Sequence, residues 1–155
     1  MAARIRSAAA AEMDTIRALF REYERWLGIS LCFQGFEQEL ADLPGKYAEP
    51  QGALLVAEVD GTVVGCVALR PLPEGICEMK RLFVRSPFLG QGLGRKLAEA
   101  VLAAAVAKGY RRIRLDTMKR MEAALALYRK LGFVEVAPYT HNPEPDVVYL
   151  EKQLA

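Results

Sequence analysis

The sequence has a single histidine, His141, and only three cysteines, Cys32, Cys66 and Cys77, at unrelated spacings. It contains no Cys-x-x-Cys pair, and no cluster of cysteine or carboxylate residues with ligand spacing surrounds His141, so we predict no metal site. An odd number of scattered cysteines is typical of a reducing compartment, where such residues are small buried hydrophobes. Because Cys77 has no histidine partner, a covalent cysteine mechanism is disfavoured.

The sequence also lacks long apolar runs and a strong excess of charge of one sign. No apolar stretch reaches the roughly 18 residues that a membrane span needs, and the N-terminal segment lacks the apolar core of a signal peptide. We therefore expect a cytoplasmic protein with no membrane partner. Lys and Arg total 21 against 19 Asp and Glu, which argues against a nucleic-acid partner. The length and the hydrophobic content of 52% predict a single domain over residues 1–155.

The apolar pattern predicts a mixture of helices and strands. Strands are expected around Ile5 and over residues 53–59, 62–69, 76–84, 112–116, 133–137 and 147–150, and helices over 9–27, 36–43, 94–108 and 120–131. The Asp60-Gly61 pair is typical of a hairpin, so the strands within 53–84 should form an antiparallel meander. Residues 76–116 read as a right-handed βαβ unit. We predict an α/β fold of the α+β type, with a mixed, mostly antiparallel sheet flanked by helices.

Three glycines at alternate positions, Gly90, Gly92 and Gly94, lie between a predicted strand and a predicted helix. Glycine lets the backbone approach a ligand closely, and the unpaired N–H groups at a helix N-terminus attract anions. The loop therefore predicts a phosphate-binding site. The spacing excludes the P-loop pattern and also the dinucleotide fingerprint Gly-x-Gly-x-x-Gly, whose third glycine would fall on Arg95 or Leu97.

Two segments resemble motifs of the Gcn5-related N-acetyltransferase (GNAT) family. The run Leu89-Gly90-Gln91-Gly92-Leu93-Gly94 is similar to the acetyl-CoA loop, Arg/Gln-x-x-Gly-x-Gly/Ala, except that its first residue is leucine. Residues 124–133, Ala-Leu-Ala-Leu-Tyr-Arg-Lys-Leu-Gly-Phe, are similar to the family segment Ala-x-x-Leu-Tyr-x-x-x-Gly-Phe. Met121 stands where many members have Asn. The resemblance implies the GNAT fold, with the βαβ unit as its central acetyl-CoA-binding element, and acetyl-CoA as cosubstrate.

The resemblance also implies how the cofactor is held. The backbone N–H groups of Leu82 and Val84 would contact the pantetheine arm and the thioester oxygen, where the strand parts from its parallel neighbour. Because Leu89 offers no polar side chain, phosphate binding would depend on the N–H groups from Gln91 to Arg95. The residues implied to contact the cofactor are Leu82, Phe83, Val84, Leu89, Gly90, Gln91, Gly92, Leu93, Gly94, Arg95 and Tyr128.

Glu78 is the candidate catalytic base, because its position is similar to that of a strand glutamate that serves as base in several GNAT enzymes. An alkylamine has a pKa near roughly 10 and must lose a proton before it attacks a thioester. An isolated glutamate in an apolar strand is expected to have a raised pKa, which suits a base. The alternative is a solvent-facing residue paired with Lys80 or Arg81. Tyr128 is the candidate acid for the CoA thiolate by resemblance, and its alternative is a core aromatic at helical spacing.

The resemblance implies an N-acetyltransferase that moves an acetyl group from acetyl-CoA to the primary amine of a small molecule by direct attack in a ternary complex. A protein or peptide acceptor, and a non-catalytic acyl-CoA-binding regulatory module, are the alternatives. A homodimer is a family expectation without independent support from the sequence. The acceptor depends on residues 25–50 and 137–147, the least patterned stretches. We expect the side chains of Lys80, Arg81 and Arg85 to be solvated.

Overall fold

The computed structural model describes residues 3–154, so Met1, Ala2 and Ala155, the ends of the predicted domain, lie outside the described residues. The strands are β1 (Ala3–Ser7), β2 (Ala53–Val59), β3 (Thr62–Leu72), β4 (Ile76–Val84), β5 (Arg112–Met118), β6 (Val134–Val136) and β7 (Val147–Gln153). The helices are α1 (Met13–Leu27), α2 (Phe36–Asp42), α3 (Leu93–Ala107) and α4 (Glu122–Lys130). Short 3-10 turns lie between several of these elements. None of the helices formed by residues 3–154 is long and apolar enough to cross a membrane.

The strands form one seven-stranded sheet in the order β1-β2-β3-β4-β5-β7-β6. The predicted meander is confirmed, because β2, β3 and β4 are antiparallel neighbours, and β1 adds a further antiparallel strand at the edge. The predicted βαβ unit is also confirmed, because β4 and β5 are parallel and are joined through α3. The C-terminal strands β6 and β7 pair antiparallel, with β7 lying between β5 and β6.

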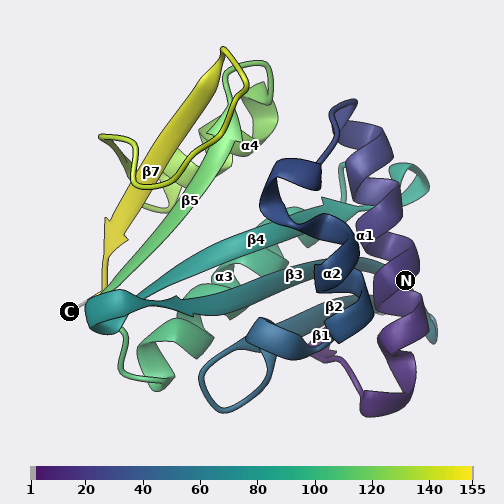
Figure 1. Cartoon of the computed structure of the whole chain (residues 1–155). Helices are drawn as coiled ribbons and strands as arrows, with labels where there is room; N and C mark the ends of the chain where they lie inside the picture. The colour runs from purple at the N-terminus through teal and green to yellow at the C-terminus, as the bar shows by residue number, and fades with distance from the viewer. Residues whose placement is uncertain (1–2, 155) are drawn as a thin grey trace.

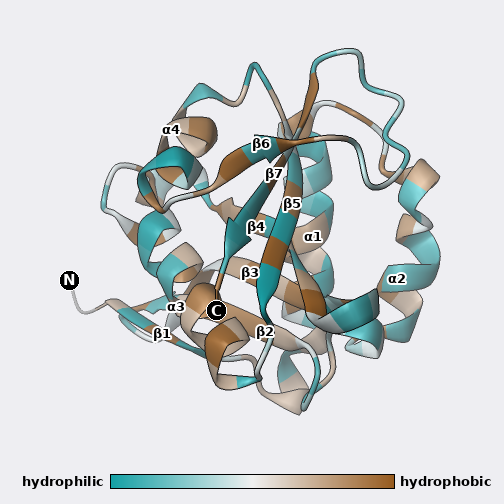
Figure 2. Cartoon of the chain, turned by 90° about the vertical axis from the view of Figure 1, so that its left-hand side faces the viewer, coloured by the Kyte–Doolittle hydropathy of each residue, from teal (hydrophilic) through white to brown (hydrophobic). Residues whose placement is uncertain are grey.

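Helices cover both faces of this sheet (Figure 1). Side chains of α3 and α4 pack on one face, and those of α1 and α2 pack on the other. Along β2, Leu55 and Ala57 join the α3 cluster, whereas Leu54 and Val56 join the α1 cluster. A strand that is buried on both faces is hydrophobic throughout, and the central strands are accordingly rich in hydrophobic residues (Figure 2).

Two details differ from the sequence-based expectation. Helical spacing predicts an inward face of α4 formed by Ala124, Leu127, Tyr128 and Leu131, whereas Leu125 is buried and Leu127 is only partly buried. The reason is that Leu127 borders a surface cleft instead of the core. Cys66 and Cys77 are buried as expected, but Cys32 is exposed because it lies in a 3-10 turn between α1 and α2.

Candidate active site

The parallel strands β4 and β5 separate after a short stretch of pairing. The last paired residues are Glu78 and Arg114, after which the two strands diverge (Figure 1). We call the opening between them the strand gap. It holds a cleft of about 50 Å³. Its walls include the following residues of β4, β5, α4 and the segment after α1: Met79, Lys80, Arg81, Leu82, Leu115, Asp116, Thr117, Tyr128, Phe33 and Gln34.

A β-bulge in β4 accompanies this divergence. Cys66 of β3 pairs with Phe83, whereas Ala68 pairs with Lys80, so β4 contains one more residue than β3 over this interval. A bulge bends its strand and increases the local twist. The bulged residue Arg81 has a φ of +63°, which is uncommon for a residue other than glycine. Strained backbone of this kind concentrates at functional sites and persists only where the surroundings hold it.

An ion pair with α2 holds the bulged residue. The guanidinium of Arg81 donates to both carboxylate oxygens of Glu39 at 3.0 and 2.8 Å, and the two side chains are only 2% and 3% exposed. The rings of Tyr23 and Phe36 lie 5.9 and 5.4 Å from the guanidinium carbon. Burial by itself would raise the pKa of Glu39, but the hydrogen bonds and charge of Arg81 outweigh it and lower this pKa.

The expectation that the side chains of Lys80, Arg81 and Arg85 are solvated is therefore wrong. Arg81 and Lys80 are both buried. Alternation along β4 places Lys80, opposite Ala68, on the face covered by α1 and α2, and the bulge turns Arg81 to the same face. Arg85 is half-buried and donates to both oxygens of Glu22 in α1, at 2.9 and 2.8 Å. Its guanidinium also donates to the carbonyl oxygen of Val63 at 3.1 Å.

Backbone donors of β4 point into the strand gap. The N–H of Arg85 donates to the carbonyl of Val64 in β3 at 2.9 Å. Because successive N–H groups of a strand point to opposite sides, those of Val84 and Leu82 are directed away from β3, toward the side that β5 has left. This orientation agrees with the predicted contacts of Leu82 and Val84 with a thioester, and the contacts themselves stay a prediction.

The glycine loop provides an open backbone surface at the start of α3. Gly92 is the residue before the helix, with a φ of +77°, and Gly90 has a φ of +81°. A Cβ atom added at either position, or at Gly94, would have no other atom within 4 Å. No side chain caps the first turn of α3, so its N–H groups are free to bind an anion. These features fit the phosphates of CoA.

An apolar cleft of about 210 Å³ joins this loop to the strand gap. Among the predicted cofactor residues, Leu82, Phe83, Val84, Leu89, Gly94 and Tyr128 line it. The side chain of Leu89 is 55% exposed and contributes apolar surface to the wall. Trp26 also borders this cleft and is 48% exposed, which places it in the pocket wall and not in the core.

Tyr128 is buried and lies between the apolar cleft and the strand gap, lining both. Its ring packs against Phe133, with 5.7 Å between ring centroids. Burial raises the pKa of Tyr128 above its usual value, so the hydroxyl group stays protonated at neutral pH. The residue therefore has both the packing of a core aromatic and the position needed for a proton donor.

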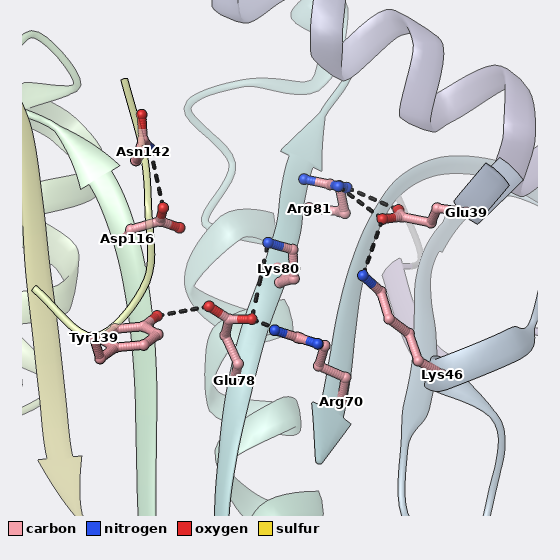
Figure 3. A network of polar contacts seen from close by, with 9 residues as sticks. All are labelled: Glu39, Lys46, Arg70, Glu78, Lys80, Arg81, Asp116, Tyr139 and Asn142. Carbon is pink, nitrogen blue, oxygen red and sulfur yellow. Dashed lines mark hydrogen bonds and ion pairs between the residues drawn. The ribbon is translucent and has the colours of Figure 1, made fainter. Parts of the chain in front are cut away.

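The surroundings of Glu78 differ from both sequence-based interpretations. Its side chain is 1% exposed and accepts hydrogen bonds from Arg70 Nε at 2.7 Å and from the Tyr139 hydroxyl at 2.6 Å (Figure 3). Lys80 Nζ lies 3.8 Å away. Burial by itself would raise the pKa of Glu78, but the charge of Lys80 and these two hydrogen bonds outweigh it and lower this pKa. The predicted raised pKa is therefore wrong. The alternative is wrong in turning Glu78 to solvent and right in pairing it with Lys80.

Several residues near Glu78 were not singled out by the sequence analysis, although most of them lie in the stretches 25–50 and 137–147. They line a further cleft of about 210 Å³, which we call the polar cleft. Its lining consists of Phe33, Gln34, Lys46, Arg70, Glu78, Lys80, Thr140 and His141. On the other side of the strand gap, Asp116 of β5 faces Lys80 and accepts a hydrogen bond from Asn142 at 3.0 Å (Figure 3). Only the position of Arg70 opposite Glu78 in the β3–β4 hairpin was open to prediction.

Comparison with known proteins identifies the family. The model of the acetyltransferase (GNAT) family matches residues 13–133. The chain belongs to the GNAT family. An uncharacterised N-acetyltransferase of Schizosaccharomyces pombe is 39% identical over 146 residues, which cover 93% of this chain and 90% of the relative. An IAA acetyltransferase of Azospirillum brasilense is 36% identical over 143 residues, which cover 91% and 92% of the two chains.

Solved GNAT structures share the fold. A GNAT-family acetyltransferase of Staphylococcus aureus superposes with a TM-score of 0.83 at 18% identity, covering 99% of this chain and 100% of the other. The PaiA N-acetyltransferase of Thermoplasma acidophilum, solved in complex with coenzyme A, superposes with a TM-score of 0.76 at 20% identity, covering 99% of each chain. With the family established, this GNAT protein is an acetyl-CoA-dependent N-acetyltransferase, and the alternative of a non-catalytic module finds no support.

Proposed function

We propose that this GNAT protein acetylates the primary amine of a small molecule by direct attack on acetyl-CoA in a ternary complex. The proposal rests on one observation: the apolar cleft, the strand gap and the polar cleft are continuous. The strand gap shares Leu82 and Tyr128 with the apolar cleft, and it shares Gln34 and Lys80 with the polar cleft. A thioester that enters from one side and an amine that enters from the other therefore meet without an intermediate carrier. The polar cleft, of about 210 Å³, suits a small acceptor better than a folded protein surface.

On the cofactor side, acetyl-CoA supplies an activated acetyl group. The N–H groups from Gln91 to Arg95 bind its phosphates, as expected of the open N-terminus of α3. The N–H groups of Leu82 and Val84 bind the thioester oxygen and stabilise the negative charge that develops on it. Leu89, where the family motif has Arg or Gln, contributes apolar contact to the pantetheine arm.

On the acceptor side, Glu78 takes the proton that the nitrogen loses as the new N–C bond forms. Because Arg70 and Lys80 keep it ionised, Glu78 is always available as an acceptor, and the proton then passes to solvent through the polar cleft. The protonated hydroxyl of Tyr128 supplies a proton to the departing thiolate.

Thiol release from acetyl-CoA, measured with a panel of amines, amino acids, polyamines and peptides, tests the proposal. At least one small primary amine should be acetylated, with formation of a ternary complex shown by intersecting initial-rate plots. Acetylation of proteins or peptides alone would support the alternative acceptor class. Parallel initial-rate lines, with an isolable acetylated protein, would contradict direct attack.

Glu78→Gln tests the assignment of the base. A general base contributes about 10²–10⁴ in rate, and the lowered pKa keeps Glu78 ionised between pH 6 and 9, so we expect kcat to fall at least tenfold across that range. Binding of CoA should be retained. Glu58→Gln is the matched control, because Glu58 is also a strand glutamate bonded to an arginine Nε, at 3.1 Å from Arg6. A kcat within twofold of wild type for Glu78→Gln would refute the assignment.

The names of the relatives do not select one acceptor. One relative is an IAA acetyltransferase, and another, 37% identical over 69% of this chain and 36% of its own length, is human N-acetylaspartate synthetase. We further propose that residues 1–155 act as one cytoplasmic domain. Homodimer formation is part of this proposal and is tested by sedimentation.

A further inference from the structure

The polar cleft has more positive charge than its own carboxylate balances. Arg70, Lys80 and Lys46 line it against one carboxylate, Glu78. The neighbouring Glu39 is shared by two cations: Arg81 donates to both of its oxygens and Lys46 Nζ pairs with one of them at 3.4 Å, so its single charge does not balance both (Figure 3). A buried or half-buried charge without a close partner is costly, so this arrangement is suited to an anionic ligand.

Arg70 and Lys80 have capacity for a further hydrogen bond. Arg70 uses Nε for Glu78, and its terminal nitrogens donate to no group of residues 3–154. Lys80 Nζ is 3.8 Å from Glu78, which is beyond hydrogen-bond distance, and its side chain is 7% exposed. Burial lowers the pKa of Lys80 to about 8, although the charge of Glu78 opposes this effect. A bound anion would stabilise the ammonium form of Lys80.

The strand gap provides the opposite charge on its far wall. Asp116 lies on β5, across the gap from Lys80, and accepts one hydrogen bond, from Asn142. A carboxylate can accept several hydrogen bonds, so Asp116 can also receive an ammonium group. The two ends of the acceptor site therefore differ in sign, and Lys80 lies where they join.

We propose that the acceptor carries a carboxylate as well as its amine, and that this carboxylate lies in the polar cleft beside Lys46, Arg70 and Lys80. The inference rests on the proposed function and narrows its substrate class to amino acids and related amino carboxylic acids. The amine of such a molecule lies toward Asp116 and the strand gap, while its carboxylate is bound by cations. Arg70 contributes a planar group of donors and the two lysines contribute point charges.

Matched pairs of substrates test the proposal. Thiol release from acetyl-CoA is measured with α-, β- and ω-amino acids and with the carboxamide of each, which keeps the amine and removes the negative charge. We expect at least one acid to have a kcat/KM about tenfold to a hundredfold above that of its carboxamide, the range of a charge-assisted hydrogen bond. Carboxamides that react as well as the acids would overturn this inference and leave the proposed function standing.

Lys46→Met then tests the location of the carboxylate. Lys46 is the most accessible of the three cations, with a side chain 35% exposed, and its removal keeps the Glu39–Arg81 pair. We expect the preference for acid over carboxamide to fall by about tenfold, and Lys46→Arg to recover part of it. Lys130→Met, at an exposed lysine of α4, is the matched control and should retain the full preference. An unchanged preference in Lys46→Met would place the carboxylate elsewhere and overturn the assignment.

A binding measurement keeps the inference testable without turnover. The protein is saturated with CoA and titrated calorimetrically with each acid and its carboxamide. Tighter binding of the acid, lost in Lys46→Met, supports the carboxylate site even if no amine is acetylated, a result that would defeat the proposed function alone. Equal affinities for acid and carboxamide would overturn the inference.

Discussion

Replacing Glu39 by glutamine should destabilise the protein strongly, although the change is nearly isosteric. Glu39 is the only carboxylate within 4 Å of the Arg81 guanidinium among residues 3–154, and both side chains are almost fully buried. Removing one partner of such a pair leaves an uncompensated buried charge and costs about 3–5 kcal/mol. For a chain of this size each kcal/mol lowers Tm by roughly 2–4 °C, so we expect a decrease of roughly 6–20 °C in a thermal melt.

A neighbouring residue provides the control for this experiment. Glu37 lies on the same helix and pairs with Arg21 at 3.1 Å, but the two side chains are 75% and 48% exposed. Exposed pairs of this kind contribute little to stability, so Glu37→Gln should melt close to wild type. If Glu39→Gln and Glu37→Gln had the same Tm, the reasoning about the buried pair would be refuted.

The loss of stability in Glu39→Gln should depend on the charge of Arg81 and on pH. The double variant Glu39→Gln/Arg81→Met should melt above Glu39→Gln alone, because the unpaired charge is gone. The folded-state pKa of Glu39 is lowered, so its contribution is fully present above the usual pKa of a glutamate and is lost as pH falls through the lower folded value. The difference in Tm between wild type and Glu39→Gln should therefore narrow in acid.

Two further substitutions test the cofactor side. Gly92→Glu should abolish calorimetric CoA binding, because a side chain and a like charge would enter the open loop, whereas Gly109→Glu, at an equally left-handed φ of +84° on the far end of α3, should bind CoA normally. Loss of binding in both variants would point to strain alone. Tyr128→Phe should lower kcat about tenfold to a hundredfold with little change in Tm if the hydroxyl protonates the thiolate. Tyr110→Phe, whose hydroxyl donates to the Gln51 carbonyl, is its control. An unaltered kcat in Tyr128→Phe would remove Tyr128 from the mechanism.

The cofactor side of the site could be predicted because its chemistry lies in contiguous sequence. The glycines from Gly90 to Gly94 are required by local backbone geometry, and the helix that follows is amphipathic. Tyr128 was assigned through the resemblance of residues 124–133 to the family segment, which is likewise contiguous in sequence. Signals of this kind need no knowledge of which strands are neighbours, so the fold class and the loop followed directly from the pattern.

The acceptor side could not be predicted in the same way, because its residues meet only through tertiary contacts. Tyr139 is 61 residues from Glu78 in sequence, and it lies in a proline-rich loop with no periodic pattern. Glu39 is 42 residues from Arg81. The pKa of Glu78 was predicted in the wrong direction for this reason: the prediction included burial in the strand but not the donors that distant segments bring to it.

The register of the β3–β4 hairpin marks the point at which prediction from local pattern fails. Counting from the turn pairs Arg70 with Glu78 and Ala68 with Lys80, as the structure has them. Unbroken alternation would next direct Arg81 to the same face as Cys77 and Met79, into the apolar cluster beneath α3.

Among residues 3–154 the buried carboxylates are Glu39 and Glu78, and both lie on the opposite face of the sheet, so a guanidinium buried beneath α3 would have no partner. The bulge moves Arg81 to the opposite face of the sheet, where Glu39 of α2 receives it. The bulge at Arg81 also bends β4 close to the point where β5 diverges from it. The buried ion pair, the left-handed φ of Arg81 and the opening of the strand gap are therefore one structural feature. A substitution that relieves the strain at Arg81 should also change the direction of the N–H groups of Leu82 and Val84, which we propose as the donors to the thioester.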